Sequence, residues 1–213
     1  MAVSESSAQR YELQDPDVRL MLQVRDDNAA AFDELMLRYQ NRLVTVLEHL
    51  TGRRDQAEDL AQEVFLRVYR ARKRYLAGAK FSTWLYTIAN HVAANARRSS
   101  SRRPEVNLTI RPNDSGGASA LDKMALAASG AMPTRQLDKA ELRDVVRAAL
   151  GELSERQRMA VLLCKFEDMS YADIATTMEM SPQAVKSLLS RARVNLKQIL
   201  EPYLQDGTRP PGS

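Results

Sequence analysis

The chain has 213 residues, 44% of them hydrophobic, with a formal net charge of +4 and a sequence pI of about 9.3. This length suits one ordinary domain or two small ones, and the mildly basic balance permits a nucleic-acid partner without requiring one. Cys164 is the only cysteine, which excludes a disulfide framework within the chain and fits a reducing cytosol. His49 and His91 form no metal spacing with it, so we expect no metal and no cofactor.

The N-terminal residues 1–17 are polar and acidic, and they lack the basic start and apolar stretch of a secretory signal. No run of about 18 uncharged apolar residues occurs in the sequence. We therefore expect a cytoplasmic protein without membrane insertion.

Apolar residues recur at helical spacing on both sides of a central segment that is rich in serine, glycine and proline. Strand-like alternation is absent. The pattern predicts an all-α fold of two small helical domains, residues 17–98 and 136–203, joined by a flexible and mostly disordered linker at 99–135. Residues 1–16 and 204–213 are then tails.

The first predicted domain is electrically polarised. Residues 26–63 hold nine acidic residues against four arginines, whereas residues 67–103 hold ten lysines and arginines and no acid. A solvated helix face normally mixes both signs, so the basic stretch favours a polyanion-binding surface over a merely soluble face.

Within the acidic half, residues 55–65 form a helix whose apolar positions share an inward face. The polar residues left outward are Asp55, Glu58, Asp59, Gln62 and Glu63. Acids near a helix start also suit the helix dipole, which accounts for Asp55 and Glu58 but not for the whole row. The row therefore favours a basic protein partner, and a solvated helix start gives these carboxyls no reason for catalytic acidity.

Aromatic residues are interleaved with the basic ones, as suits single-stranded nucleic acid, on which aromatic rings can stack. Phe81 and Trp84 fall on the apolar stripe of a helix, so we expect them to pack in the core, whereas Tyr86 points elsewhere and is freer to contact DNA. Residues 75–80 read as a loop before that helix.

The second predicted domain is a chain of capped helices. Ser154 with Gln157 forms a capping box, Ser170 caps the next helix, and Ser181 followed by Pro182 starts a third. A helix of about eight residues then ends near residue 178, three residues turn, and a longer helix runs from 182 to about 200. This is helix-turn-helix spacing. The alternative is a plain helical hairpin with a solvated basic face.

The long helix carries basic residues and no acid between residues 180 and 200, as expected for a helix that enters the major groove. The residues of its first turns that face away from the apolar stripe, where base edges would be read, are Gln183, Lys186, Ser187 and Ser190.

Both domains together resemble one family. AFDEL at 31–35, DQAEDLAQEVF at 55–65 and FSTWLYTIA at 81–89 resemble region 2 of extracytoplasmic-function (ECF) RNA polymerase sigma factors. LSERQR at 153–158, SYADIA at 170–175, VKS at 185–187 and RAR at 191–193 resemble their region 4. The resemblance covers nearly everything except the two tails and the linker.

The resemblance implies a non-enzymatic subunit that directs promoter recognition, promoter melting and transcription initiation. The acidic row would bind the clamp of the largest subunit of bacterial core RNA polymerase, and the second domain would bind the flap of the other large subunit. An anti-sigma factor is a further expected partner. The residues implied for the minus-ten promoter element are Arg74, Tyr75, Lys80, Tyr86, Asn90, His91, Asn95, Arg97 and Arg98, and those for the minus-thirty-five element are Gln183, Lys186, Ser187, Ser190, Arg191 and Arg193.

Four residues depart from the family pattern. Asn90-His91 stands where many members have Arg-Asn, and Leu188 replaces a frequent arginine. Glu179 occupies a turn position that is often glycine, which predicts a left-handed backbone with a strain of about 1 kcal/mol or a different turn.

The sequence also bears on two other functions. A helix-turn-helix regulator that acts without being a polymerase subunit shares the second-domain motifs but leaves the first domain unexplained. A nucleic-acid enzyme is disfavoured because the sequence has no metal cluster, nucleophile–base pair or phosphate-binding glycine loop.

Overall fold

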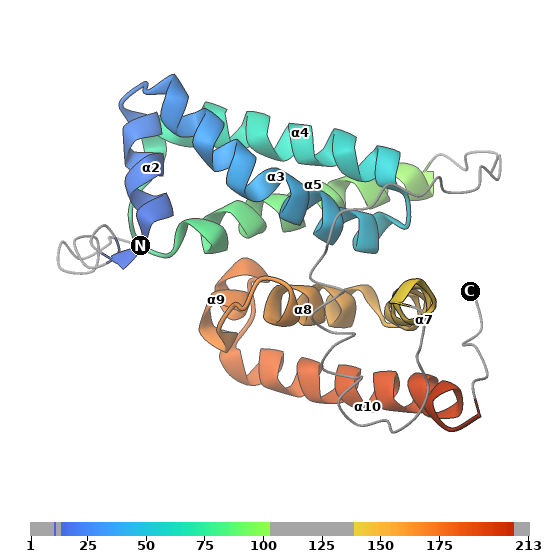
Figure 1. Ribbon diagram of the computed structural model, residues 1–213. Coiled ribbons are helices and arrows are strands. Elements are labelled where there is room, and N and C mark those ends of the chain that lie inside the picture. The colour runs from blue at the N-terminus through green and yellow to red at the C-terminus, as the bar shows by residue number, and fades with distance from the viewer. Residues whose placement is uncertain (1–10, 12–13, 103–138, 207–213) are drawn as a thin grey trace.

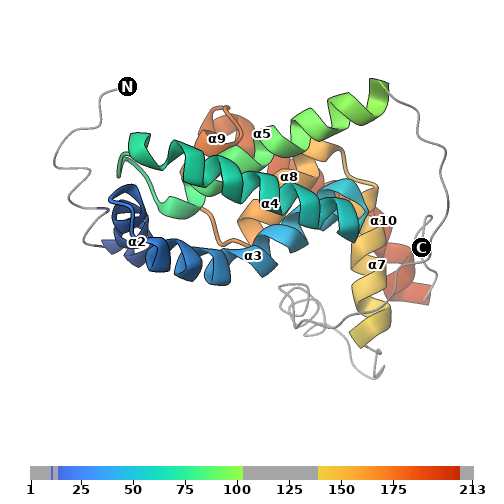
Figure 2. The same ribbon diagram turned by 90° about the horizontal axis from the view of Figure 1, so that it is seen from above.

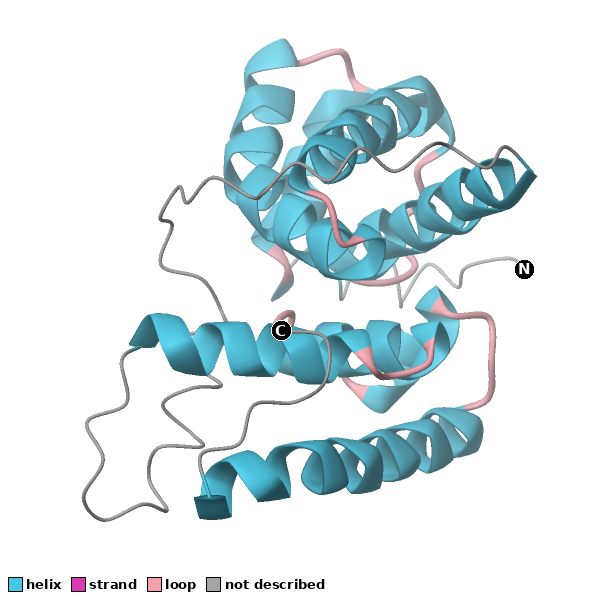
Figure 3. Ribbon diagram, turned by 90° about the vertical axis from the view of Figure 1, so that its right-hand side faces the viewer, coloured by secondary structure: helices cyan, strands magenta, loops and turns pink. Residues whose placement is uncertain are grey.

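The computed structural model describes residue 11, residues 14–102 and residues 139–206, and every regular element in these ranges is a helix (Figures 1 and 3). The first lobe consists of α2 (Pro16–Arg25), α3 (Ala29–Thr51), α4 (Arg54–Ala71), the short 3-10 helix η1 (Arg72–Arg74) and α5 (Phe81–Arg102). The second lobe consists of α7 (Lys139–Gly151), α8 (Glu155–Lys165), α9 (Tyr171–Thr177) and α10 (Pro182–Asp206). The prediction of an all-α fold with two helical units is confirmed.

The predicted linker at 99–135 lies outside the described residues except for 99–102, which are helical and continue α5. The predicted tails lie largely outside as well. The long helix of the second lobe also extends six residues beyond the predicted end at 200, with Pro202 inside it.

Packing of the first lobe follows the apolar stripes of its helices. α3 buries Leu35, Tyr39, Leu43 and Leu47 toward α4 and α5. α4 buries Ala57, Ala61, Val64, Phe65 and Val68, which are spaced three and four residues apart, so the inward face predicted for this helix is confirmed. The polar row of α4 is thereby fixed on its outer side.

Asp15 ties the start of α2 to the start of α5. One carboxylate oxygen of Asp15 caps α2 by accepting from the Asp17 N–H at 2.9 Å. The other accepts from the Phe81 N–H at 3.1 Å, 66 residues further along the chain. A single carboxylate therefore satisfies amide donors at two helix starts and fixes where α5 begins.

The three predicted caps of the second lobe are confirmed. The Gln157 side chain accepts from the Ser154 N–H at 3.1 Å within a capping box, and Ser170 accepts from the Asp173 N–H at 3.1 Å. Ser181 accepts from the Ala184 N–H at 3.1 Å at the start of α10. Each helix boundary of the helix-turn-helix is thus set by its own local sequence.

The turn between α9 and α10 passes through Glu179 with φ 54°, so the left-handed backbone expected at this position is confirmed. The Met180 N–H donates to the Ala175 carbonyl at 2.9 Å and closes the end of α9.

The two lobes pack against each other. α9 lies against α5, and α8 and α7 lie against α3, whereas α10 lies on the side of the second lobe away from the first (Figures 1 and 2). The first helix of the helix-turn-helix, α9, therefore contacts the first lobe on one side, and the long helix α10 faces outward.

The left-handed glycine that follows α3 gives a prediction about backbone strain. Gly52 has φ +76° and Gly151 ends α7 without positive φ, and neither has an atom within 4 Å of an added Cβ. We predict that Gly52→Ala lowers the free energy of unfolding by about 1 kcal/mol through left-handed strain. Gly151→Ala is the control and should raise it by about 0.5 to 1 kcal/mol. Urea denaturation of both variants measures this, and equal effects of the same sign would contradict the assignment.

Candidate protein-binding and nucleic-acid-binding surfaces

The acidic row of α4 is exposed as predicted, but most of its carboxylates have arginine neighbours. Asp55 pairs with Arg53 at 2.5 Å, Glu58 with Arg54 at 3.0 Å, and Glu63 with Arg67 at 2.7 Å. The Arg53 side chain lowers the pKa of Asp55, which keeps that carboxyl ionised. Asp59 has no such pair within the described ranges, so it offers a carboxylate that a partner can bind without displacing an arginine.

One stripe of α4 combines acidic, polar and apolar contacts. Asp55, Asp59, Gln62 and Leu66 follow one another at intervals of four, three and four residues and therefore share a face. Leu66 is 51% exposed, so it adds an apolar contact to the polar side chains of this face. The sequence reasoning missed Leu66, although its spacing from Gln62 was a usable signal. We call these four residues the α4 stripe.

The basic stretch of the first lobe presents a mixed surface along η1, the loop at 75–80 and α5. Its predicted minus-ten residues that are exposed or half-buried are Arg74, Lys80, Asn90, His91, Asn95, Arg97 and Arg98. Asn95 accepts a hydrogen bond from Arg98 one turn on, and residues 75–80 form a loop as expected.

Two tyrosines of that set are buried. Tyr75 is 2% exposed and its ring packs edge-on against Trp84 with 4.9 Å between ring centres. Tyr86 is fully buried, with its hydroxyl beside the Glu167 carboxyl of the second lobe, and burial raises its pKa. The expectation that Tyr86 is free of packing is wrong, because the side of α5 that its ring faces is covered by the second lobe.

Four further predicted minus-ten residues, besides Tyr86, contact the second lobe directly. Lys80 lies 3.6 Å from the Asp173 carboxylate, and the Asn90 amide reaches the Thr177 carbonyl at 3.5 Å. His91 contacts the Glu179 carboxylate at 3.0 Å, and Arg97 pairs with Glu155 at the start of α8. The second lobe thus occupies a surface that the sequence assigns to DNA.

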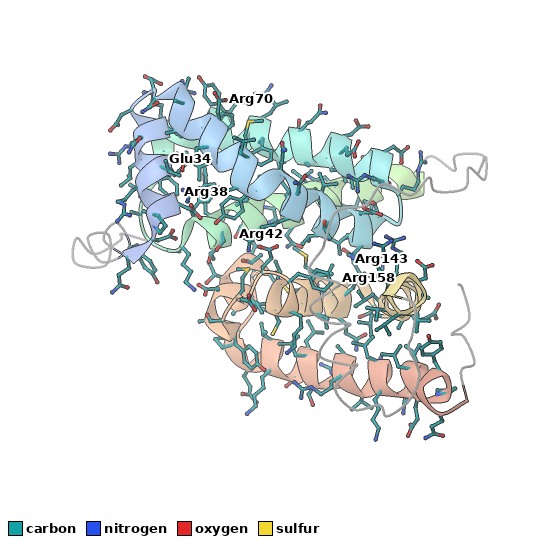
Figure 4. All side chains as sticks on the ribbon, in the orientation of Figure 1. Glu34, Arg38, Arg42, Arg70, Arg143 and Arg158 are labelled. Atoms are coloured by element: carbon teal, nitrogen blue, oxygen red, sulfur yellow. The ribbon has the colours of Figure 1, made fainter. Side chains whose placement is uncertain are left out.

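The junction between the lobes also has a buried polar centre. Arg42 of α3 pairs at 2.6 Å with Glu167, whose side chain is 1% exposed, and Arg42 lies at this junction in Figure 4. Beside it, the Thr83 hydroxyl donates to Asp173 at 3.1 Å and the buried Thr177 hydroxyl donates to the Thr83 carbonyl at 3.4 Å. Burial raises the pKa of Glu167, and the Arg42 guanidinium opposes that rise.

The predicted DNA-reading face of α10 is open. Gln183, Lys186, Ser187, Ser190, Arg191 and Arg193 are all exposed, while Val185, Leu189 and Ala192 are buried against the rest of the lobe. The apolar stripe and the polar face therefore divide as the sequence predicted. Arg191 donates to the Ser187 carbonyl within the helix at 3.4 Å.

Within residues 14–102 and 139–206 no cluster of three histidine, cysteine, aspartate or glutamate side chains could hold a metal ion. None of the helices described there is both long enough and apolar enough to cross a bilayer.

Comparisons with known proteins follow the same division of the chain. A family model described as Sigma-70 region 2 matches residues 35–103, and one described as Sigma-70, region 4 matches residues 143–196. The RNA polymerase sigma-H factor of Pseudomonas aeruginosa is 32% identical, over 91% of this chain and 98% of its own length. The ECF RNA polymerase sigma-E factor of Haemophilus influenzae is 30% identical, over 88% and 97%.

Solved structures show a similar fold. CnrH, in complex with the cytosolic domain of CnrY, is 21% identical with a TM-score of 0.59, covering 85% of this chain and 95% of that one. The sigma factor RpoE of Bartonella quintana, in complex with the anti-sigma factor NepR, is 24% identical with a TM-score of 0.57, covering 80% and 96%. The chain belongs to the sigma-70 family and is an RNA polymerase sigma factor of the extracytoplasmic-function group.

His49, at the end of α3, is buried at the junction of the lobes. Its ring packs against Phe166 with 5.6 Å between ring centres, and its backbone carbonyl accepts from Arg158 at 3.1 Å. Burial, with the nearby Arg147 and Arg158, lowers the pKa of His49 to about 4. Arg158 lies beside this end of α3 in Figure 4.

This histidine makes stability depend on pH. An unfolded histidine binds a proton near pH 6.5, whereas folded His49 stays neutral to about pH 4, so its contribution is complete above pH 6.5 and is lost as the pH falls toward 4. Between pH 8 and pH 5 we expect a loss of about 2 kcal/mol that His49→Gln removes. Denaturant titrations at several pH values measure it, and an unchanged pH slope in the variant would contradict the assignment.

Proposed function

We propose that this sigma factor binds core RNA polymerase through the α4 stripe, captures the minus-ten element with the basic surface of α5, and reads the minus-thirty-five element with α10. The observation that carries the proposal is the separation of two basic surfaces on two lobes, with an acidic surface on a third face. One protein partner and two promoter elements then have distinct places to bind.

Capture of the minus-ten element needs contacts to backbone and to an unpaired base. Arg74 of η1, Lys80 of the loop, and Arg97 and Arg98 of α5 supply cations, and the loop at 75–80 has small residues that let a base approach. Unstacking a base costs a few kcal/mol. The free energy gained when the base stacks on a side chain and makes contacts in a pocket is of comparable size. Melting by capture of the single strand therefore requires no ATP, and the chain needs no catalytic group.

Reading of the minus-thirty-five element rests on the first turns of α10. Lys186, Ser187 and Gln183 project from the exposed face near the N-terminus of the helix, where a recognition helix reaches base edges. Arg191 and Arg193 follow one to two turns later, where they would contact the phosphates that flank the groove. This lobe is proposed to bind the flap of the other large subunit of core RNA polymerase.

An anti-sigma factor is the proposed regulator, since RpoE of Bartonella quintana, which has a similar fold, forms a complex with the anti-sigma factor NepR. Action on chromosomal promoters places the chain in the cytoplasm. The rival is a helix-turn-helix regulator that binds duplex DNA without polymerase.

Reconstitution separates these two functions. The purified chain should co-elute with bacterial core RNA polymerase and direct specific transcript starts on genomic DNA that core alone ignores. Tight binding of duplex DNA by the free chain, with no association with core, would instead favour the rival regulator.

The outward polar row of α4, which includes Asp59 of the α4 stripe and Glu63 beside it, gives a prediction about polymerase binding. Asp59→Lys with Glu63→Lys should abolish binding to core polymerase, since two carboxylates facing a basic partner become cations. Asp144→Lys with Glu201→Lys makes the same charge change on the exposed surface of the second lobe and should leave binding intact. Size-exclusion chromatography with core measures both, and circular dichroism checks the fold. Retained association of the first variant would remove the docking assignment.

The α10 face gives a prediction about promoter preference. Lys186→Ala should weaken promoter binding by about 1 to 3 kcal/mol and change the preferred minus-thirty-five sequence. Lys165→Ala, an exposed lysine at the end of α8, is the matched control and should leave that preference unchanged. Holoenzyme binding to a promoter library measures both. An equal loss on random duplex would show that Lys186 contacts only phosphate.

A further inference from the structure

The loop at 75–80, to which the proposed function assigns an unpaired base, is anchored at both ends by residues that flank α2. The anchor at its C-terminal end is Asp15, the N-cap of α2, whose carboxylate accepts from the N–H of Phe81, the first residue of α5, at 3.1 Å. Besides α5, α2 also contacts η1, so it lies along the whole connection between α4 and α5 (Figures 1 and 2).

The anchor at the N-terminal end of the loop is Asp27, directly after the C-cap of α2. Its carboxylate pairs with Arg72 at 3.1 Å and with Lys73 at 2.5 Å, both in η1. Hydrogen bonds from Lys73 and Arg72 lower the pKa of Asp27, so the carboxyl stays ionised. The Arg72 guanidinium also lies 4.0 Å from the centre of the Tyr69 ring. These contacts fix η1, and with it the start of the loop, against the turn that follows α2.

The backbone at Asp27 separates the role of its carboxylate from the shape of the turn. Asp27 has φ 68°, a left-handed conformation that glycine adopts without strain and that strains a residue with a Cβ. Glycine would therefore serve the turn at least as well. What the aspartate adds is the pair of contacts to η1.

The two anchors fix the register of the loop. Tyr75 is 2% and Ala77 is 6% exposed, whereas Leu76 between them is 64% exposed. This alternation is that of an extended chain, in which a slip of one residue would exchange the buried and the outward positions. The ten residues of α2 span about 15 Å at about 1.5 Å per residue, and the six loop residues span at most about 20 Å. A loop with its ends near the two ends of α2 therefore has little slack.

We propose that α2 is a positioning element for strand capture, with Asp15 and Asp27 holding the two ends of the loop in the register that presents its outward side to the single strand. Both residues act through the loop and not by contact with DNA. The inference rests on the proposed minus-ten function. It extends that function beyond residues 35–103, which the Sigma-70 region 2 model matches, because α2 lies before them.

The test measures promoter opening by holoenzyme made with the full-length chain. The promoter is the one identified by reconstitution, with 2-aminopurine at one position of its minus-ten element, so that fluorescence reports unstacking. Asp27→Gly removes the carboxylate and relieves the left-handed strain. Asp26→Asn is the control, because it removes the same charge one residue earlier, at a side chain that is 70% exposed.

Asp27→Gly should lower the opening rate at least about fivefold, since small errors in position greatly weaken a contact that depends on geometry. Its melting temperature and its binding to core polymerase should match the wild type, and Asp26→Asn should open the promoter at the wild-type rate. Loss of an anion by itself strengthens DNA binding, so slower opening would not follow from net charge. Asp27→Asn, which also tolerates the left-handed backbone, should slow opening too and is decisive if Asp27→Gly melts at a lower temperature.

A mutant cycle tests whether Asp27 acts through η1. Arg72→Gln with Lys73→Gln removes its partners, and addition of Asp27→Gly to that pair should slow opening no further. A further loss in the triple variant, or wild-type opening by both Asp27 variants, would overturn the positioning role. If the wild-type holoenzyme itself opened no promoter, the proposed minus-ten function would fail and this inference with it.

Discussion

The buried carboxylate of Glu167 is the constraint on which the arrangement of the two lobes depends. An ionised carboxylate removed from water is destabilising by several kcal/mol unless a partner compensates it. The compensation comes from Arg42, at 2.6 Å, on the other lobe. The next residue, Asp168, has φ 49°, so the backbone between α8 and α9 turns through a left-handed conformation directly after Glu167. The register of α9 on α5, with Thr83 against Asp173 and His91 against Glu179, follows from that anchor.

The parts of the structure that could be predicted from sequence are those fixed by neighbours along the chain. The helix caps join residues three positions apart, as in Ser154 with Gln157 and Ser181 with Ala184. The caps and the helix-turn-helix spacing can therefore be predicted from short stretches of sequence. The inward face of α4 is likewise a matter of helical spacing. The arginine partners of Glu58 and Glu63 are also four residues away, so these ion pairs follow from the i,i+4 spacing in the sequence.

The parts that could not be predicted depend on contacts between distant segments. Tyr86 looked free because helical periodicity says which way a side chain points but not what lies there. Its surroundings include Glu167, and the neighbouring Thr83–Asp173 bond joins residues 90 positions apart. The same limit applies to Asn90 and His91, whose departures from the family pattern coincide with contacts to the second lobe. Asn90 and His91 therefore both depart from the residues that the family pattern has for DNA contact and form contacts between the two lobes.

The choice of which surface is covered has a physical logic. Single-stranded nucleic acid is bound by cations and stacking with little regard to sequence, so an open minus-ten surface would bind any exposed strand in the cell, RNA included. A recognition helix in a duplex gains most of its affinity only at the correct bases, so it can stay open at less risk of false binding. In this structure α9 covers part of α5 while the polar face of α10 is exposed, so under the proposed function the less discriminating surface is the one that is covered. Such an arrangement gives specificity by blocking wrong partners rather than by improving the right one.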